Sequence, residues 1–178
     1  MVRKIGLRYF KKTFLFAFIL SIIIFLPFQR VLVIEDAKTN KLLAYLPLHR
    51  NKDTFEISYT HSIHLSNVVE TYTVLKDGTI RQIELTYEDT AIGMPSNAEK
   101  GEIFKLEDGK YHLLNMRRDM PSIYMRTAQV VGTHRIISNN HELDLAEVIP
   151  PGSLILLTEQ RLALWELWKG VNIVGRST

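Results

Sequence analysis

An unbroken apolar stretch dominates the start of the chain. No charged residue occurs from Thr13 to Gln29, and basic residues flank the stretch on both sides. As an α-helix these positions would extend over about 26 Å, close to the ~30 Å hydrocarbon core of a bilayer. The side chains would be apolar on every face of this helix, whereas a helix on a protein surface carries a single apolar stripe. The pattern therefore predicts a transmembrane anchor over residues 13–30.

The residues around this stretch predict its orientation. The segment 1–12 contains five basic and no acidic residues, and the positive-inside rule places such a segment in the cytoplasm. We therefore expect a single-pass protein of the cell membrane whose main domain is extracytoplasmic. A cleaved signal peptide would end in small residues, but this stretch ends with Leu26, Pro27 and Phe28. The sequence favours an uncleaved signal-anchor.

After Arg30 the apolar positions change to the two-residue alternation of β-strands. The segment Thr54–Thr60 shows it most clearly, because every second side chain is apolar. We expect about nine or ten strands over residues 31–158, forming an all-β domain that is either a β-sandwich or barrel-like. The candidate strands are 31–35, 41–48, 54–60, 68–75, 79–87, 102–106, 110–114, 123–130, 134–138, 142–145 and 153–158. The predicted hairpin turns contain Thr39-Asn40, Lys76-Asp77-Gly78, Asp108-Gly109 and Asn139-Asn140.

The tail, residues 159–178, departs from the strand pattern. Leucine and tryptophan residues alternate there with charged ones in the manner of a short amphipathic helix, and Gly170 would end it. Leu164, Trp165 and Trp168 have two interpretations. They pack on an open end of the β domain, or the two tryptophans lie at a membrane interface or contact a partner.

Composition and charge narrow the possible functions. The chain contains no cysteine, which excludes disulfide scaffolds, thiolate metal sites and cysteine nucleophiles. The net charge of +3 conceals two opposite parts. Residues 1–30 hold six of the 22 basic residues and no acid, so residues 31–178 carry 16 basic against 19 acidic residues. A nucleic-acid partner is therefore not expected. The basic stretch Arg117-Arg118-Asp119 is interpreted as a solvated loop.

Candidate chemistry is concentrated between residues 55 and 95. His61 and His64 follow a predicted strand, and Glu70 with Tyr72 shares one face of the next strand, with Glu84 in the strand after it. Imidazole and carboxylate groups could bind zinc, so a metal-assisted hydrolase that uses His61, His64 and Glu70 is one hypothesis.

A serine hydrolase built on Ser62 is disfavoured, because no strand–Gly-x-Ser-x-Gly–helix elbow is present. Two other interpretations of the same residues stay open. The residues could form a hydrogen-bonded polar corner in which Tyr59 and His61 cap the strand end. They could instead form a contact site for a small molecule or a protein. A loop at 91–96, shaped by Gly93 and Pro95, is expected to lie over this corner.

Several of these segments resemble a bacterial family labelled domain of unknown function 1850. The resemblance extends over residues 31–158, and the segments that carry it are Tyr59-Thr60-His61-Ser62, Glu70, Gly93-Met94-Pro95 and Pro150-Pro151-Gly152. Proteins of this kind are small and exported or singly anchored. They are frequently encoded beside TAXI-type tripartite transporters of the TRAP class, which pair a solute receptor with a membrane permease. The family carries no established activity.

From the residues and the resemblance together, we expect an accessory or binding component of such a transporter. The resemblance implies the membrane, the permease or the solute receptor as partners, and no cofactor. We expect a binding role rather than catalysis, with a structural envelope protein as a further alternative. The contact site is predicted to contain Tyr59, His61, Ser62, Glu70, Glu84 and Gly93.

Overall fold

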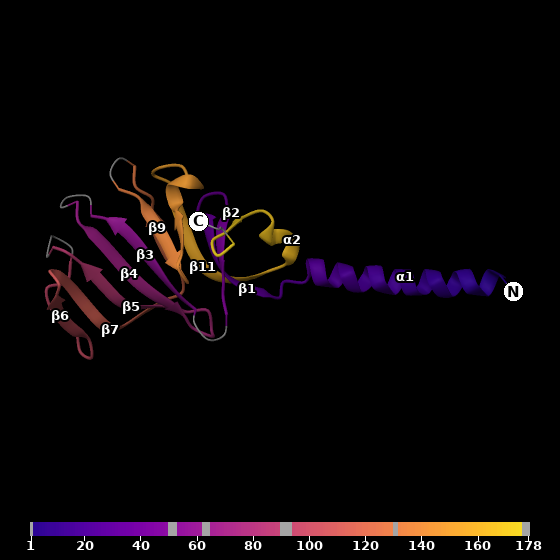
Figure 1. Ribbon diagram of the computed structural model, residues 1–178, viewed down its shortest axis with the longest axis horizontal. Helices are drawn as coiled ribbons and strands as arrows, with labels where there is room; N and C mark the ends of the chain where they lie inside the picture. The colour runs from indigo at the N-terminus through magenta and orange to yellow at the C-terminus, as the bar shows by residue number, and fades with distance from the viewer. Residues whose placement is uncertain (1, 50–52, 62–64, 90–93, 130–131, 176–178) are drawn as a thin grey trace.

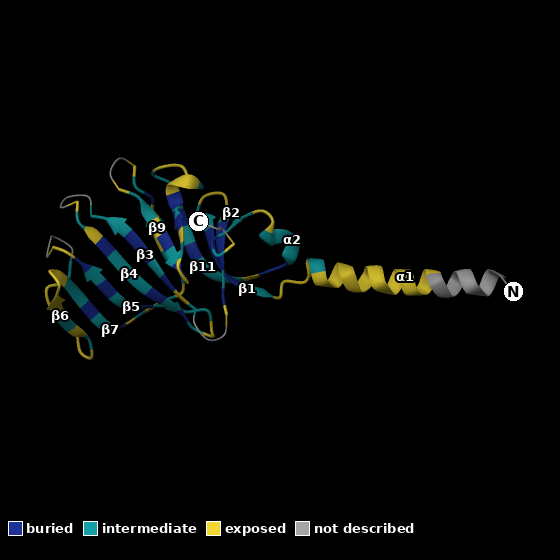
Figure 2. Cartoon of the chain, viewed as in Figure 1, coloured by how far each residue is buried: buried dark blue, intermediate teal, exposed yellow. Residues whose placement is uncertain are grey.

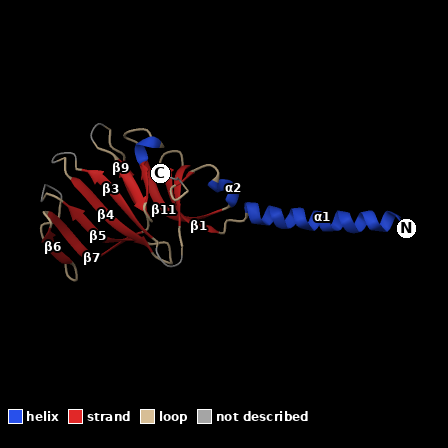
Figure 3. Cartoon of the chain, in the orientation of Figure 1, coloured by secondary structure: helices blue, strands red, loops and turns tan. Residues whose placement is uncertain are grey.

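A long helix and a two-sheet β domain make up the protein (Figure 1). The computed structural model describes residues 2–49, 53–61, 65–89, 94–129 and 132–175. Helix α1 (Val2–Phe25) projects away from the β domain, and its described side chains are exposed almost throughout (Figure 2). Strands account for most of the rest of the chain, and the other helical segments are short (Figure 3).

The strands form a five-stranded and a seven-stranded sheet. The five-stranded sheet has the order β12-β2-β1-β11-β8, and the seven-stranded sheet has the order β10-β9-β3-β4-β5-β7-β6. The strands are β1 (Gln29–Asp36), β2 (Lys41–Pro47), β3 (Thr54–Thr60), β4 (Asn67–Val74), β5 (Ile80–Tyr87), β6 (Ile103–Glu107), β7 (Lys110–Met120), β8 (Ile123–Arg126), β9 (His134–Ser138), β10 (His141–Asp144), β11 (Leu154–Leu162) and β12 (Val171–Asn172). A short 3-10 helix (Leu145–Glu147) and helix α2 (Leu164–Leu167) lie between them.

The main core lies between the two sheets. Alternate residues of β1, such as Leu32 and Ile34, point inward and meet Phe55 and Ile57 of β3. All four are at least 98% buried. A second, smaller apolar cluster lies on β4, β5 and β7 and contains Val68, Leu85, Tyr87, Leu113 and Met116. The architecture confirms the predicted all-β sandwich.

The C-terminal segment covers the outer face of the five-stranded sheet. Leu162 joins Val31, Val33 and Tyr45 in a buried cluster on that face, against which Leu167 of α2 packs. The tail therefore does more than form the predicted amphipathic helix. Strand β11 continues to Leu162 because its last residues pair with the first residues of β1, and α2 contains only four residues.

Most predicted turns and strands are found where the sequence places them. Strands β3 and β9 match their predicted ranges. The turn residues Asn40, Asp108, Asn139 and Asn140 adopt positive φ, as does Gly78. The interpretation of 117–119 as a loop is wrong, because these residues belong to β7. Asp119 pairs across the sheet with Arg81, which gives the charged stretch a partner on the neighbouring strand.

Helix α1 and the predicted anchor 13–30 have different ends. The helix ends at Phe25, and Gln29 already belongs to β1. Pro27 explains this boundary, because its ring disfavours a helical conformation at the residue before it. Within the described residues, no helix combines the length and the apolar character needed to cross a membrane.

Candidate functional site

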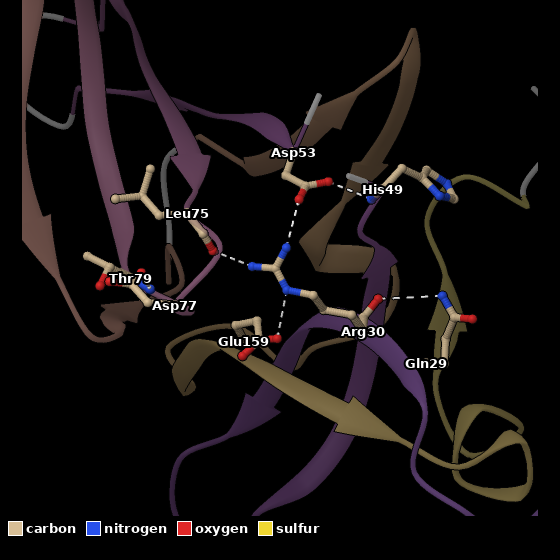
Figure 4. A network of polar contacts seen from close by, with 8 residues as sticks. All are labelled: Gln29, Arg30, His49, Asp53, Leu75, Asp77, Thr79 and Glu159. Atoms are coloured by element: carbon tan, nitrogen blue, oxygen red, sulfur yellow. Dashed lines mark hydrogen bonds and ion pairs between the residues drawn. The ribbon is translucent and has the colours of Figure 1, made fainter. Parts of the chain in front are cut away.

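Two polar clusters are considered as candidate sites in the β domain. The first, here called the Arg30 network, contains Arg30, Asp53, Leu75 and Glu159 and lies where the chain enters β1 after α1 (Figure 4). The Arg30 guanidinium donates to Glu159 Oε1 at 2.9 Å and to Asp53 Oδ2 at 2.9 Å. It also donates to the carbonyl oxygen of Leu75.

The Arg30 network joins both sheets. Arg30 and Glu159 belong to β1 and β11 of one sheet, whereas Asp53 precedes β3 and Leu75 follows β4 in the other sheet. The Asp53 side chain is only 6% exposed, and those of Arg30 and Glu159 are each 20% exposed. A planar guanidinium can bind three acceptors in fixed directions, which suits a junction of this kind. We assign the network a structural role.

The second cluster, here called the Glu70 cluster, contains Tyr59, Glu70, Tyr72 and His134 on the seven-stranded sheet. Glu70 is half-buried on β4, on the side of the sheet that faces the core. The Tyr72 hydroxyl donates to Glu70 Oε2 at 2.7 Å, and the Tyr59 hydroxyl donates to Oε1 at 3.4 Å. Each carboxylate oxygen therefore accepts one phenolic hydrogen bond.

Both tyrosines in the Glu70 cluster are held in their protonated form. Burial raises the pKa of each phenol, and the negative charge and hydrogen bond of Glu70 raise it further. Phenolate chemistry at these positions is thereby disfavoured. The two hydroxyls act as permanent donors, and Glu70 presents a carboxylate fixed in direction.

His134 extends the Glu70 cluster to strand β9. Its ring stacks on Tyr59 with 5.4 Å between ring centroids, and the two residues are paired across β3 and β9. The backbone N–H of Ala128 donates to His134 Nδ1 at 3.3 Å, which leaves Nε2 to carry the proton of the neutral ring. Burial lowers the pKa of His134, while the charge of Asp144 opposes this effect.

A row of aromatic rings continues from the Glu70 cluster across the sheet. Register pairs Tyr59 with Val68, Val68 with Tyr87, and Tyr87 with Tyr111. The Tyr87 and Tyr111 rings stack at 5.5 Å, and the Tyr87 hydroxyl donates to the carbonyl oxygen of Pro95. The described end of the predicted 91–96 loop is therefore attached to the same end of the sheet as Tyr59.

The predicted contact residues are placed unequally. Tyr59 and Glu70 meet, as described above. The backbone of His61 closes the β3–β4 hairpin, because its N–H donates to Ser66 O at 2.8 Å and its carbonyl accepts from Leu65 N. Two further predicted contact residues, Ser62 and Gly93, lie outside the described residues, as does His64 of the metal hypothesis.

Glu84 lies on the opposite face of the sheet from Glu70. It pairs with Thr71, the residue after Glu70, and neighbouring residues of a strand point to opposite faces. Its carboxylate lies 3.6 Å from His112 Nδ1 and accepts from the Thr86 hydroxyl at 3.3 Å. Glu84 and Glu70 therefore form separate polar groups rather than one convergent site.

The metal hypothesis finds no support in the described part of the chain. There, no group of three or more histidine or acidic residues is arranged to hold a metal ion. His64 belongs to the proposed trio but lies outside that part, so the trio of His61, His64 and Glu70 stays a prediction.

Sequence reasoning did not include two members of the Glu70 cluster in the predicted site. Tyr72 could have been included, because it lies two positions from Glu70 on the same face of a strand. His134 could not be placed from local pattern. It meets Tyr59 only because β9 pairs with β3, and that pairing joins residues 75 positions apart in the chain.

Comparison with known proteins gives one match. The family model described as Domain of unknown function (DUF1850) matches residues 55–145. The matched region begins in β3, includes β10, and contains all four residues of the Glu70 cluster. Comparison with curated proteins and with solved structures finds no match. Because 91 of the 178 residues are covered, the chain belongs to the DUF1850 family of domains of unknown function.

Proposed function

We propose that the protein is a membrane-anchored, extracytoplasmic binding component that assists a TAXI-type TRAP transporter. The observation that carries the proposal is the Glu70 carboxylate, which two tyrosine hydroxyls hold at fixed positions on the sheet. In this proposal, α1 holds the protein at the membrane and the Glu70 cluster contacts the solute or the transporter subunit.

The anchor part of the proposal is supported by the exposure of α1. Large apolar side chains that are 43% to 69% exposed follow one another along the helix from Phe10 to Phe25. A run of exposed apolar surface on this scale marks an interaction with lipid or with another protein. Water would solvate it poorly, because apolar surface favours transfer out of water.

The backbone donors just after α1 are satisfied within the chain, which supports the anchor part of the proposal. The uncharged helical positions 13–25 extend over about 20 Å, and Leu26, Pro27 and Phe28 continue the uncharged stretch beyond the helix. Leu26 N donates to Ile22 O, Phe28 N donates to Leu26 O, and Pro27 has no N–H. The backbone donors of these residues therefore need no water, as a lipid environment demands.

The binding part of the proposal follows from the hydrogen-bonding capacity of Glu70. An ionised carboxylate has about four acceptor sites, and the two tyrosine hydroxyls use two of them. The remaining sites can accept from an N–H or ammonium group of a partner. Because the phenols stay protonated, the cluster is suited to binding rather than to nucleophilic chemistry.

Co-purification of the tagged full-length chain from detergent-solubilised membranes tests the proposal. Mass spectrometry should show enrichment of the TRAP permease or the solute receptor over an untagged control. The Glu70→Gln variant should lose this enrichment, because the amide keeps the shape and removes the charge.

Two results would count against the proposed function. If neither transporter subunit is enriched with the wild-type chain, the transporter association is wrong. If the subunits are enriched and solute uptake is unaffected by loss of the protein, a structural envelope role is the better interpretation.

A further inference from the structure

The most exposed large apolar side chain of the described residues belongs to the C-terminal segment. Trp168, directly after α2, is 86% exposed. A tryptophan that buries neither face of its ring gains nothing from the fold and leaves a large apolar area in water. We therefore expect that something outside the described residues contacts the Trp168 ring.

The surroundings of Trp168 continue the exposed surface of α1. Helix α2 lies against the C-terminal end of α1, where the Phe25 and Trp165 rings approach to 6.3 Å between centroids. Phe25, Leu26 and Phe28 are 61%, 56% and 46% exposed. Together with Trp165, Trp168 and Lys169 they form what is here called the base patch, at the junction of helix and β domain (Figure 1).

The base patch contains one basic side chain, that of Lys169, and Glu35, Lys41 and Glu166 lie near it. The Lys169 ammonium lies 3.8 Å from the centroid of the Trp165 ring, within the range of a cation–π contact. The one acidic side chain of α2, Glu166, accepts from the backbone N–H of Ala163 at 2.8 Å. A tryptophan ring beside lysine suits the headgroup layer of an anionic membrane.

The base patch is held firmly on the β domain. Leu162 and Ala163, which precede α2, are 7% and 1% exposed. Gly170, which follows it, lies so close to β2 that an added Cβ would be 2.8 Å from the side chain of Leu42. Contact between the patch and a flat surface would therefore fix the orientation of the whole β domain.

We propose that the base patch is a lipid-interface contact that seats the β domain on the headgroup layer of the bilayer. The inference rests on the anchoring role proposed above for α1. Trp165 and Trp168 lie at the level of the lipid glycerol and headgroup region, and Lys169 binds anionic headgroups. The Glu70 cluster, in the middle of β3 and β4, then lies farther from the membrane than the base patch.

Fluorescence of the full-length chain in vesicles tests this inference. Both tryptophans of the chain belong to the base patch, so its emission reports on no other region. The Trp165→Phe variant isolates Trp168. It is reconstituted into vesicles of phosphatidylcholine with a minority of phosphatidylglycerol, prepared with lipids brominated either near the headgroup or near the end of the acyl chain.

A tryptophan placed elsewhere on the β domain provides the matched control. Tyr124 is 64% exposed on β8. It pairs with Leu156, which in turn pairs with Glu35, six residues from the start of β1 at Gln29. Tyr124→Trp in a chain lacking both native tryptophans should therefore report a position on the order of 20 Å from the start of β1 along the strand.

The inference predicts that Trp168 emission shifts to the blue and loses most of its intensity with lipids brominated near the headgroup. Lipids brominated at the chain end should quench it less, and the Tyr124→Trp control should be quenched only by aqueous iodide.

If the protein floats with the vesicles while Trp168 is quenched by iodide alone, the base patch inference is overturned and the anchor stands. Shielding from iodide without quenching by bromine indicates a protein contact and also overturns it. A chain that does not float contradicts the anchor itself.

Discussion

The Arg30 network and the Glu70 cluster place charge inside the same sandwich in opposite ways. Arg30 meets two carboxylates and a carbonyl drawn from both sheets. Glu70 meets two neutral hydroxyls, and within the described residues these are its side-chain partners. In the first arrangement, one guanidinium binds both carboxylates of the network. In the second arrangement, two neutral hydroxyls donate to one carboxylate.

Because of this difference, we expect substitutions in the two clusters to have different main effects. Removing one member of an ion network leaves the other buried charges without a partner. Altering a carboxylate that is bound by neutral donors leaves no unpaired opposite charge. We therefore expect substitutions in the Arg30 network to act mainly on the free energy of unfolding. Substitutions in the Glu70 cluster should act mainly on partner recovery.

The largest effect is expected for Arg30→Ala. It leaves Asp53 and Glu159 without their cation, and the free energy of unfolding should fall by roughly 3 kcal/mol, the low end for a broken buried pair. The low end applies because two of the three side chains keep some contact with solvent. Urea unfolding of the full chain in mild detergent, followed by circular dichroism, measures the loss.

Arg81→Ala is the matched control for Arg30→Ala. Arg81 also forms a two-point ion pair, but its side chain and that of Asp119 are 31% and 45% exposed. Its loss should lower the free energy of unfolding clearly less than the loss of Arg30, because exposed ion pairs contribute little to stability. Equal losses for the two variants would show that the Arg30 network stabilises the fold no more than an exposed ion pair does.

A smaller effect is expected for Gly78→Ala, beside the Arg30 network. Gly78 has a φ of +90°, and an added Cβ would lie 2.9 Å from Glu159 Oε2. We expect a loss of about 2 kcal/mol, from backbone strain and from displacement of Glu159. Gly109 has a similar φ of +77° with nothing near its Cβ position, so Gly109→Ala should show the strain alone. Identical unfolding midpoints for the two variants would contradict this role of Glu159.

Tyr72→Phe should cost less again, about 1.5 kcal/mol, because it removes a single hydrogen bond to a charged group. Tyr59→Phe should cost less than Tyr72→Phe, since the Tyr59 hydroxyl is 3.4 Å from Glu70 and that of Tyr72 is 2.7 Å from it. Chemical unfolding ranks the two variants. The reverse order would show that the geometry of the Glu70 cluster is described incorrectly.

The smallest effect concerns His134 and pH. Burial lowers the pKa of His134 in the folded protein below its unfolded value of about 6.5. Below that pH the unfolded chain binds the proton more readily, so stability should fall as pH drops from about 6.5 toward the folded pKa. His134→Phe keeps an aromatic ring against Tyr59 and should flatten this part of the profile. An unchanged slope between pH 7 and 5 in the variant would assign the effect to other groups.

The local sequence pattern was sufficient to predict those strands and turns that depend on the preferences of neighbouring residues. The alternation in Thr54–Thr60 and the turn residues at Asp108-Gly109 report backbone preferences that act within a few residues. Other segments differ from the prediction because they pair with strands that are distant in the sequence. Residues 159–162 form a strand because β1 lies beside them, and residues 117–119 extend β7 because β5 offers Arg81 as a partner.

The same limit applies to the candidate site. Glu70 and Tyr59 were accessible to pattern reasoning, because one hairpin connects their strands. The face of Glu84 depends on irregular pairing, with register shifts after Thr71 and between Gln82 and Glu84. A residue count from Glu70 across two strands does not reveal such shifts, and a bulge changes which face a side chain occupies.

Partner recovery with Glu70→Gln, measured beside Glu84→Gln, tests most directly whether the Glu70 cluster is the binding end of the molecule. The two substitutions make the same chemical change on opposite faces of adjacent strands. Glu70→Gln should lose the co-purified transporter subunit while the domain stays folded, and Glu84→Gln should retain the subunit. Full recovery of the subunit with Glu70→Gln, or equal loss with both variants, would contradict the assignment of binding to the Glu70 cluster.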